Sequence, residues 1–253
     1  MTRADRTRIL PQPHRQRSDA GPSAKVSIRW ANQGFDLLAD RAAYWRKART
    51  LIIADAHFGK AAAFRSAGVP VPEATTQSNL DRLTRALQQT GATRLMILGD
   101  FLHARSGRAP QTMDAIAAWR DQRNDLEITL VRGNHDRNAG DPPEQWRMRC
   151  VDEPFVEGGV RFVHDPATCA DDASPGRALP AMGGHVHPCA ILHDVDGSAM
   201  RVACFHVSPG LAVLPAFGAF TGMHPVRPRA GDRVFALGAG AVVEVRSQAA
   251  ARR

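Results

Sequence analysis

The stretch Leu126-Glu127-Ile128-Thr129-Leu130-Val131, with Gly133-Asn134-His135-Asp136 close behind it, sets the expectation for the fold. Its first part is apolar and rich in β-branched residues, which predicts a buried strand. Gly133 predicts a sharp turn, and an amide, an imidazole and a carboxylate follow it without a gap. Open α/β sheets place their sites beyond the carboxyl ends of their strands, so this segment predicts a functional site at such an edge.

Four other apolar segments, at 50–54, 94–98, 160–163 and 179–182, also end in polar side chains. The residues that follow them are Asp55 and His57, Asp100 and His103, His164, and His185 and His187. In an extended chain, side chains at i and i+2 project to one face, so the Asp-x-His and His-x-His spacings predict pairs of metal ligands.

The donor types in these five segments suit divalent first-row metals. Carboxylate, imidazole and amide oxygen together favour Mn²⁺, with Fe²⁺ and Zn²⁺ as alternatives. Seven ligands, with Asn134 included, exceed what one ion takes. A shared carboxylate lets them hold two ions, with a metal-bridging hydroxide placed to attack phosphorus in a phosphoester.

Length and composition favour an α/β protein without membrane spans. The 253 residues, 43% hydrophobic, suffice for one large α/β domain or two small ones. Strands and helices alternate first and short strands dominate later, which predicts two packed sheets with helices outside them. The apolar run 211–220 is too short to span a bilayer, and the amino-terminal residues lack the apolar segment of a secretory signal. Four cysteines without a CxxC pair favour reduced thiols and a cytoplasmic location.

Most of the net charge of +8 lies in the two ends of the chain. Residues 1–24 and 246–253 each carry +3 and are predicted to be basic tails, the first of them disordered. The single predicted domain, 25–245, carries only +2. Basic tails can hold a phosphate backbone by counterion release, and they can equally be solvated ends.

The five motifs Asp55-x-His57, Gly99-Asp100-x-x-His103, Gly133-Asn134-His135-Asp136, His164 and Gly184-His185-x-His187 resemble those of the calcineurin-like metallophosphoesterases. This resemblance covers about residues 50–190. The sequences of 51–60, 99–103 and 214–218 are similar to those of one subgroup, the ligase-associated DNA damage response endonucleases (PdeM), over about residues 35–222.

The resemblance implies a four-layer α/β/β/α sandwich, with two mixed sheets flanked by helices. It also implies a ligand set for each of two divalent ions, with Asp100 bridging. The first ion would be held by Asp55, His57, Asp100 and His187. The second would be held by Asp100, Asn134, His164 and His185. His135 would protonate the leaving oxygen, a general-acid role worth roughly 10²–10⁴ in rate.

One position departs from the pattern of many phosphatases of this superfamily. Those enzymes carry a carboxylate where this chain has His103, and that carboxylate orients the catalytic histidine. Asp136 is predicted to take over as the partner of His135, although adjacent side chains can point apart. The alternative is that His103 hydrogen-bonds behind the metal ligands. Lys60 and Arg65 are predicted to meet substrate phosphates, or else to be solvated helix charges.

These features predict a two-metal phosphodiesterase, a DNA endonuclease acting in DNA repair. Association with a DNA ligase or helicase repair system is implied by the resemblance alone. A phosphatase, or a phosphodiesterase for small molecules or cyclic nucleotides, would use the same metal core and is the alternative. A non-catalytic binding module is disfavoured because no ligand and no catalytic histidine is missing.

Overall fold

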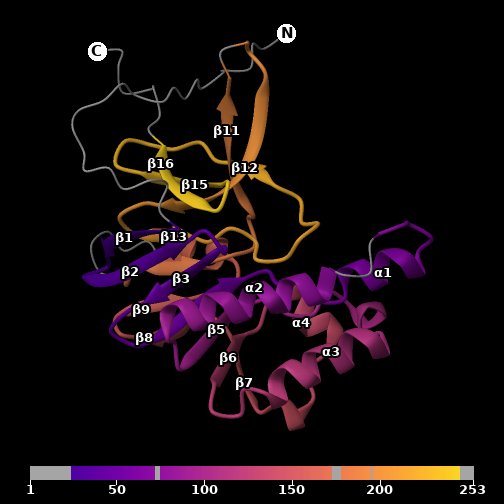
Figure 1. Ribbon diagram of the computed structural model, residues 1–253. Coiled ribbons are helices and arrows are strands. Elements are labelled where there is room, and N and C mark those ends of the chain that lie inside the picture. The colour runs from indigo at the N-terminus through magenta and orange to yellow at the C-terminus, as the bar shows by residue number, and fades with distance from the viewer. Residues whose placement is uncertain (1–23, 72–74, 173–177, 195, 246–253) are drawn as a thin grey trace.

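The computed structural model describes residues 24–71, 75–172, 178–194 and 196–245, and Figure 1 shows their arrangement. The first of two mixed sheets has seven strands that follow one another in chain order. They are β1 (Lys25–Trp30), β2 (Gln33–Leu38), β3 (Ala42–Trp45), β4 (Thr50–Ala54), β5 (Arg94–Leu98), β6 (Glu127–Val131) and β7 (Met148–Val151). Strands β1 to β4 are antiparallel neighbours, and β4 to β7 are parallel.

The second sheet has nine strands, in the order β14-β11-β12-β13-β10-β9-β8, with β15 paired to β12 and β16 paired to β15. These strands are β8 (Phe155–Glu157), β9 (Val160–Phe162), β10 (Ala181–Gly183), β11 (Pro188–His193), β12 (Ala199–Val207), β13 (Leu211–Val213), β14 (His224–Pro225), β15 (Arg233–Gly238) and β16 (Ala241–Val245). The hairpin of β11 and β12 projects from the body of the protein (Figure 1).

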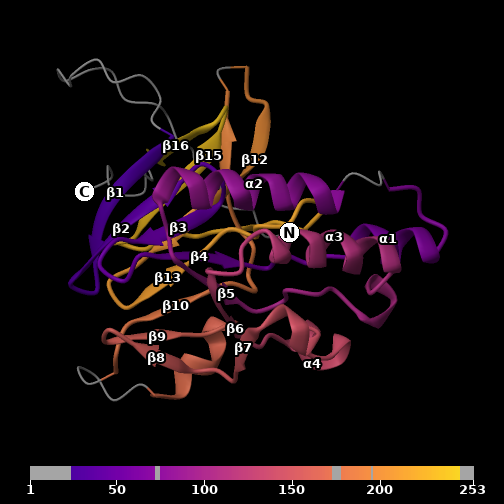
Figure 2. The ribbon, with the colours of Figure 1, turned by 60° about the horizontal axis from the view of Figure 1, so that its bottom comes forward.

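The α-helices of the described residues all precede residue 140. They are α1 (Lys60–Ser66), α2 (Thr75–Thr90), α3 (Pro110–Asp121) and α4 (Asn134–Ala139). Short 3₁₀ segments lie at η1 (Arg105–Gly107), η2 (Glu144–Trp146) and η3 (Pro166–Asp172). Helices α2 and α3 lie side by side along one face of the first sheet (Figure 2).

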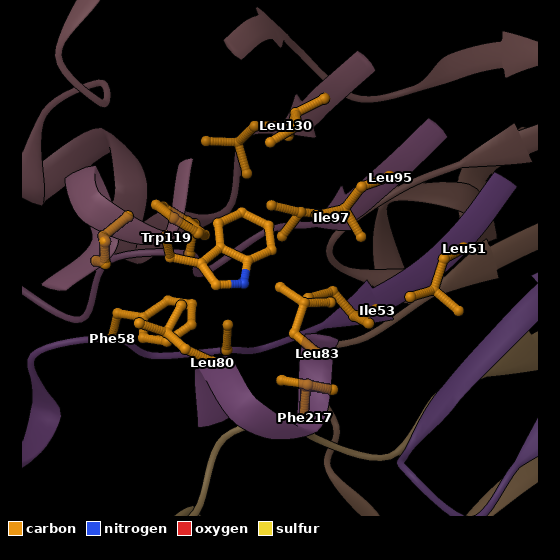
Figure 3. Close-up of a cluster of buried hydrophobic side chains, with 14 of the residues drawn as sticks. Leu51, Ile53, Phe58, Leu80, Leu83, Leu95, Ile97, Trp119, Leu130 and Phe217 are labelled. Carbon is orange, nitrogen blue, oxygen red and sulfur yellow. The ribbon is translucent and has the colours of Figure 1, made fainter. Parts of the chain in front are cut away.

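The outer core lies between these two helices and the first sheet. Leu80 and Leu83 recur at a helical spacing in α2, and Trp119 reaches in from α3. They pack on alternate residues of the strands, such as Leu95 and Ile97 of β5, as Figure 3 shows. Burial of this apolar stripe holds α2 and α3 against the sheet.

The inner core lies between the two sheets. The strand residues that point away from the helices, such as Ile52 and Met96, meet Phe162 and Phe205 of the second sheet. Arg94 and Glu157 tie β5 to β8 by a bidentate ion pair, with N–O distances of 2.5 and 2.9 Å. This packing fixes the loops of both sheets relative to one another.

The α/β fold of two mixed sheets with helices is confirmed. Strands β4 and β5 have the predicted bounds. Both are buried on both faces, so each forms a nearly continuous apolar run whose ends are visible in the sequence. Five of the helices and strands described were not predicted: α1, α4, β7, β8 and β14. They are short, and their segments carry little apolar periodicity. The predicted tails lie outside the described residues, apart from residue 24. Among the helices described, none has the length and apolar content that a bilayer crossing needs.

Candidate metal centre

The five predicted ligand-bearing loops meet at one edge of the sandwich. In the parallel register, Ala54 lies opposite Leu98, and Leu98 lies opposite Val131, so the segments after β4, β5 and β6 leave the sheet side by side. Strands β9 and β10 are parallel neighbours in the second sheet, and they bring the segments of His164 and His185 to the same place. The chain topology therefore assembles the site from residues 130 positions apart.

The predicted ligands form two of the three groups whose ligand atoms lie within 4.8 Å of one another, and the third group is His57, His103 and His135. The first group is Asp55, His57 and His187, and the second is Asp100, His164 and His185. Asn134 joins the second group, because its Oδ1 is 2.9 Å from His164 Nε2.

Asp100 stands between the two groups. Its Oδ2 is 3.7 Å from His57 Nε2 in the first group, and its Oδ1 is 3.4 Å from His164 Nε2 in the second. Oδ2 thus faces the first group, and Oδ1 faces the histidine of the second. A carboxylate shared by two ions would be placed in this way, and the bridging role of Asp100 stays a prediction.

The backbone of the ligands differs from the prediction. Asp55, His57, Asp100, His185 and His187 all have left-handed backbones, with φ of 54°, 47°, 53°, 63° and 49°. The expectation of extended Asp-x-His and His-x-His segments was therefore wrong. Left-handed residues other than glycine are uncommon and cost energy, and they cluster where function requires the conformation. Here the tight turns let ligands from neighbouring loops point into one small volume.

Hydrogen bonds behind the ligands set the orientation of two imidazole rings. His164 Nδ1 is 3.1 Å from the carbonyl oxygen of Leu98, and His187 Nδ1 is 3.1 Å from that of Gly222. A carbonyl oxygen only accepts, so Nδ1 donates in both rings, and in the neutral form Nε2 carries the lone pair. Each Nε2 faces the centre, where neutral imidazole is the form that binds a metal. Burial lowers the pKa of His57 to about 2, so the His57 ring is neutral at neutral pH.

Two observations show that the cluster fits cations. Oδ1 of Asp55 is buried and has no hydrogen-bond partner among the described residues, while its Oδ2 accepts from the His185 N–H at 2.9 Å. An ionised oxygen buried without a partner is costly unless a cation reaches it. The glycines of the motifs leave space for the ligands, since a Cβ at Gly184 would lie 2.5 Å from Asp55 Oδ2.

Gly133 serves the same purpose and not the predicted one. Its φ of −92° and ψ of −179° are open to any residue, so no turn requires glycine there. A Cβ on Gly133 would instead lie 2.3 Å from Asp100 Oδ1. The glycine is needed because the Asp100 carboxylate packs directly against its backbone.

His135 lies beside the two groups and is oriented by a backbone carbonyl. Its Nδ1 donates to the carbonyl oxygen of His103 at 2.6 Å, and its Nε2 lies 3.9 Å from Asp100 Oδ2. The rings of His103 and His135 stack, with centroids 4.9 Å apart. This places the far nitrogen of His135 at the edge of the centre, in reach of a group bound there.

The structure corrects the prediction that Asp136 orients His135. Asp136 is buried, and its carboxylate accepts from the backbone N–H groups of Phe101, Leu102 and Gly133 at 2.9, 3.2 and 3.0 Å. The adjacent side chains point apart because Asp136 is the third residue of helix α4, where a carboxylate caps the N–H group ahead of the helix. It therefore joins two motif loops and does not contact the His135 ring.

The segment that carries these motifs matches a known protein family. Residues 48–192 match the family described as calcineurin-like phosphoesterase. The chain belongs to this family. It is a metal-dependent phosphoesterase, and the two groups around Asp100 are where its divalent ions would bind.

The phosphoesterase is also similar to individual proteins of known structure. The crystal structure of Pseudomonas putida nuclease MPE is 38% identical, covers 87% of this chain and 99% of its own, and superposes with a TM-score of 0.74. The phosphoesterase YfcE from E. coli is 14% identical with a TM-score of 0.37, and a single mutant of Vps29 from Entamoeba histolytica is 18% identical with a TM-score of 0.35. Each of these two covers 78% of this chain and 98% of its own. No curated protein matches the phosphoesterase.

The other predicted residues of the phosphoesterase occupy different positions around the centre. Burial lowers the pKa of Lys60, and the nearby carboxylates of Asp100 and Asp55 oppose that effect, which places its ammonium group within their field. Arg65 donates to the carbonyl oxygen of Val71 at 3.3 Å and so holds the loop after α1. His103 Nδ1 lies 3.4 Å from His57 Nδ1, behind a metal ligand, as the alternative reading of His103 expected.

Two contributors to the site were missed in the sequence. Oε2 of Glu153 accepts from the N–H groups of His164 and Asp165 at 2.8 and 3.0 Å, which fixes the loop that carries a ligand. The carbonyl of Gly222 orients His187 from a segment without an ionisable side chain. A backbone acceptor leaves no residue-type signal, and a lone glutamate in an irregular segment is not distinctive.

Proposed function

We propose that this phosphoesterase is a Mn²⁺-dependent DNA endonuclease that acts in DNA repair. The observation that carries the proposal is its 38% identity with the P. putida nuclease over 87% of the chain, together with a complete ligand set around Asp100. The mixture of imidazole, carboxylate and amide oxygen donors supports Mn²⁺ among the divalent ions.

The residues around the centre divide the work on a phosphodiester between them. Two divalent ions, when bound, would neutralise phosphate charge and lower the pKa of the attacking water. His135, when protonated, donates from Nε2 to the oxygen of the departing strand, while its Nδ1–H stays bonded to the His103 carbonyl. That bond holds the ring in one orientation, so Nε2 already points toward the centre when the leaving oxygen needs a proton. Lys60 adds positive charge beside the carboxylates of Asp100 and Asp55.

Cleavage of circular DNA tests the proposal directly, because a circle has no ends and only internal cleavage opens it. The purified chain, freed of metal, is incubated with circular single-stranded DNA and supercoiled plasmid, with and without Mn²⁺. We expect Mn²⁺-dependent linearisation or nicking. Absence of cleavage with Mn²⁺, Fe²⁺ and Zn²⁺ would overturn the proposal. Hydrolysis of phosphomonoesters or cyclic nucleotides by the same sample would then favour the alternative activity.

A repair role predicts association with a DNA ligase or helicase and a cytoplasmic location. Both stay predictions, supported by the resemblance of the motifs and by the absence of CxxC pairs among the four cysteines. Affinity purification of the tagged chain after DNA damage tests the association. Recovery of neither enzyme class would count against it without affecting the proposed chemistry.

A further inference from the structure

A pocket of about 220 Å³ opens directly beside the metal centre. Its volume is more than ten times the roughly 15 Å³ that one water requires. One wall is His187, whose Nε2 lies 3.5 Å from Asp55 Oδ1 in the first ligand group. The opposite parts come from Ala203 of β12 and from the loop of residues 216–223. A molecule bound at the metal centre would therefore lie within reach of the pocket.

Phe220 stands at this pocket in an unusual state. Its side chain is 53% exposed, and its backbone has a left-handed φ of 59°. Such a conformation is a genuine outlier for a bulky residue and costs free energy. The loop is tied to the centre on both sides of Phe220, since Gly218 N–H donates to Asp55 O at 3.0 Å and Gly222 O accepts from His187. The fold thus holds an aromatic ring out in solvent next to its metal ligands.

The pocket also contains a cation. Arg41 lines it, and its Nη1 donates to the carbonyl oxygens of Ala216 and Gly218, both at 3.3 Å. In the described part of the chain, no carboxylate oxygen lies within 4.0 Å of this guanidinium. The pocket therefore combines an exposed aromatic face with uncompensated positive charge.

A flat ring joined to an anionic phosphate matches both features. We infer that this pocket receives the base of the nucleotide that adjoins the scissile phosphate, with the base stacked on Phe220. The inference rests on the proposed function, because it takes the phosphodiester at the metal centre to belong to DNA. Every base offers a π face, so stacking of this kind gives affinity with little sequence preference.

Paired substrates test this inference. One is a single-stranded oligonucleotide with all its bases, and the other has the same backbone with abasic sites throughout. With the Mn²⁺-loaded full chain, Phe220→Ala should raise KM for the intact strand about 5- to 150-fold, the range that stacking of one base gives. KM for the abasic strand and kcat for both should stay near the wild-type values, because stacking acts on ground state and transition state alike. Phe220→Tyr should retain the wild-type preference for the intact strand.

Two more variants separate the pocket from general effects. Ala203→Leu fills the pocket from β12 and should reduce the preference for the intact strand as Phe220→Ala does. Val156→Ala is the matched control, since Val156 is 52% exposed on β8, at the opposite end of the sheet from β14 and β11. It should leave both substrates unaffected.

Binding of the same two strands to the full chain without added metal is measured by fluorescence anisotropy. If wild type cleaves DNA but Phe220→Ala weakens the binding of intact and abasic strands equally, the subsite is overturned and the proposed function stands. If wild type cleaves no DNA, the proposed function fails, and the anisotropy ratio still decides whether the pocket takes a base. If the wild type binds the intact and the abasic strand with nearly equal Kd, the subsite is overturned in either case.

Discussion

Replacing Asp136 by alanine tests how the two motif loops are held together. The substitution removes the acceptor of three backbone N–H groups, those of Phe101, Leu102 and Gly133, and leaves them without a partner. A buried donor left unsatisfied costs about 1–3 kcal/mol, so the gross loss is about 3–9 kcal/mol. The variant is therefore expected to unfold more easily even when no metal is bound.

Burial of the carboxylate offsets part of this loss. It raises the pKa of Asp136 from 3.8 to about 6, and two units correspond to about 3 kcal/mol at 1.36 kcal/mol per unit. We expect a net destabilisation of about 0–6 kcal/mol at neutral pH, the gross loss of about 3–9 kcal/mol less the offset of about 3 kcal/mol. Because the pKa is raised in the folded protein, the contribution of the carboxyl group is fully present below about pH 4 and declines as pH rises through about 6. The difference between wild type and Asp136→Ala should therefore be larger at pH 4 than at pH 7.

Urea unfolding in the presence of a chelator measures this difference without a contribution from metal. Asp152→Ala is the matched control, because the Asp152 side chain is 74% exposed and its contact with Arg132 is 3.3 Å. An exposed pair of this kind contributes about 0–1 kcal/mol. If Asp136→Ala unfolds within about 1 kcal/mol of wild type at pH 4, where burial of the charge no longer offsets the loss, the assignment of its carboxylate to the loop N–H groups is refuted. A loss of activity confined to esters with poor leaving groups would instead make Asp136 the partner of His135.

Three further predictions follow from the same geometry. His135→Ala should slow cleavage of natural diesters by about 10²–10⁴ and spare activated aryl esters, whose leaving groups need no proton; equal losses in steady-state assays of both would argue for positioning alone. Gly133→Ala should weaken Mn²⁺ binding in calorimetry, because its Cβ would lie 2.3 Å from Asp100 Oδ1, and wild-type affinity would refute the close-packing explanation. Glu157→Gln should lower the free energy of unfolding by about 0.5–2 kcal/mol at pH 7, because Arg94 holds the pKa of Glu157 below its usual 4.5. That stabilisation declines as pH falls below about 4.5 and through the lowered pKa, so the difference at pH 3 should be smaller than at pH 7.

The sequence was most informative where a strand is buried on both faces and runs straight into a polar cluster. Thr50–Ala54 and Arg94–Leu98 are such strands, and their bounds were predicted without error. Asp55 and Asp100 follow them directly. Since parallel strands end at the same edge of a sheet, the order of apolar and polar residues was enough to bring the ligands together.

The conformation of the ligands and the partners of their side chains could not be predicted in the same way. Residue type does not reveal that Asp55 and His57 are left-handed, because tertiary packing imposes that conformation. Asp136 is adjacent to His135 in the sequence, and only the start of helix α4 shows that its carboxylate turns toward Gly133. The orientation of His135 depends on a carbonyl oxygen, which every residue has, so no sequence pattern marks it.

The number of Mn²⁺ ions bound per chain tests most directly whether Asp100 joins two metal sites. Metal-free wild type and Asp100→Ala are equilibrated with Mn²⁺, separated from free ions and analysed for metal content and for phosphodiester hydrolysis. We expect two ions per wild-type chain, and fewer than one in Asp100→Ala with turnover abolished, because each carboxylate oxygen faces one ligand group. Full turnover by a wild type that holds a single ion, or two ions retained by an active Asp100→Ala, would contradict the shared site.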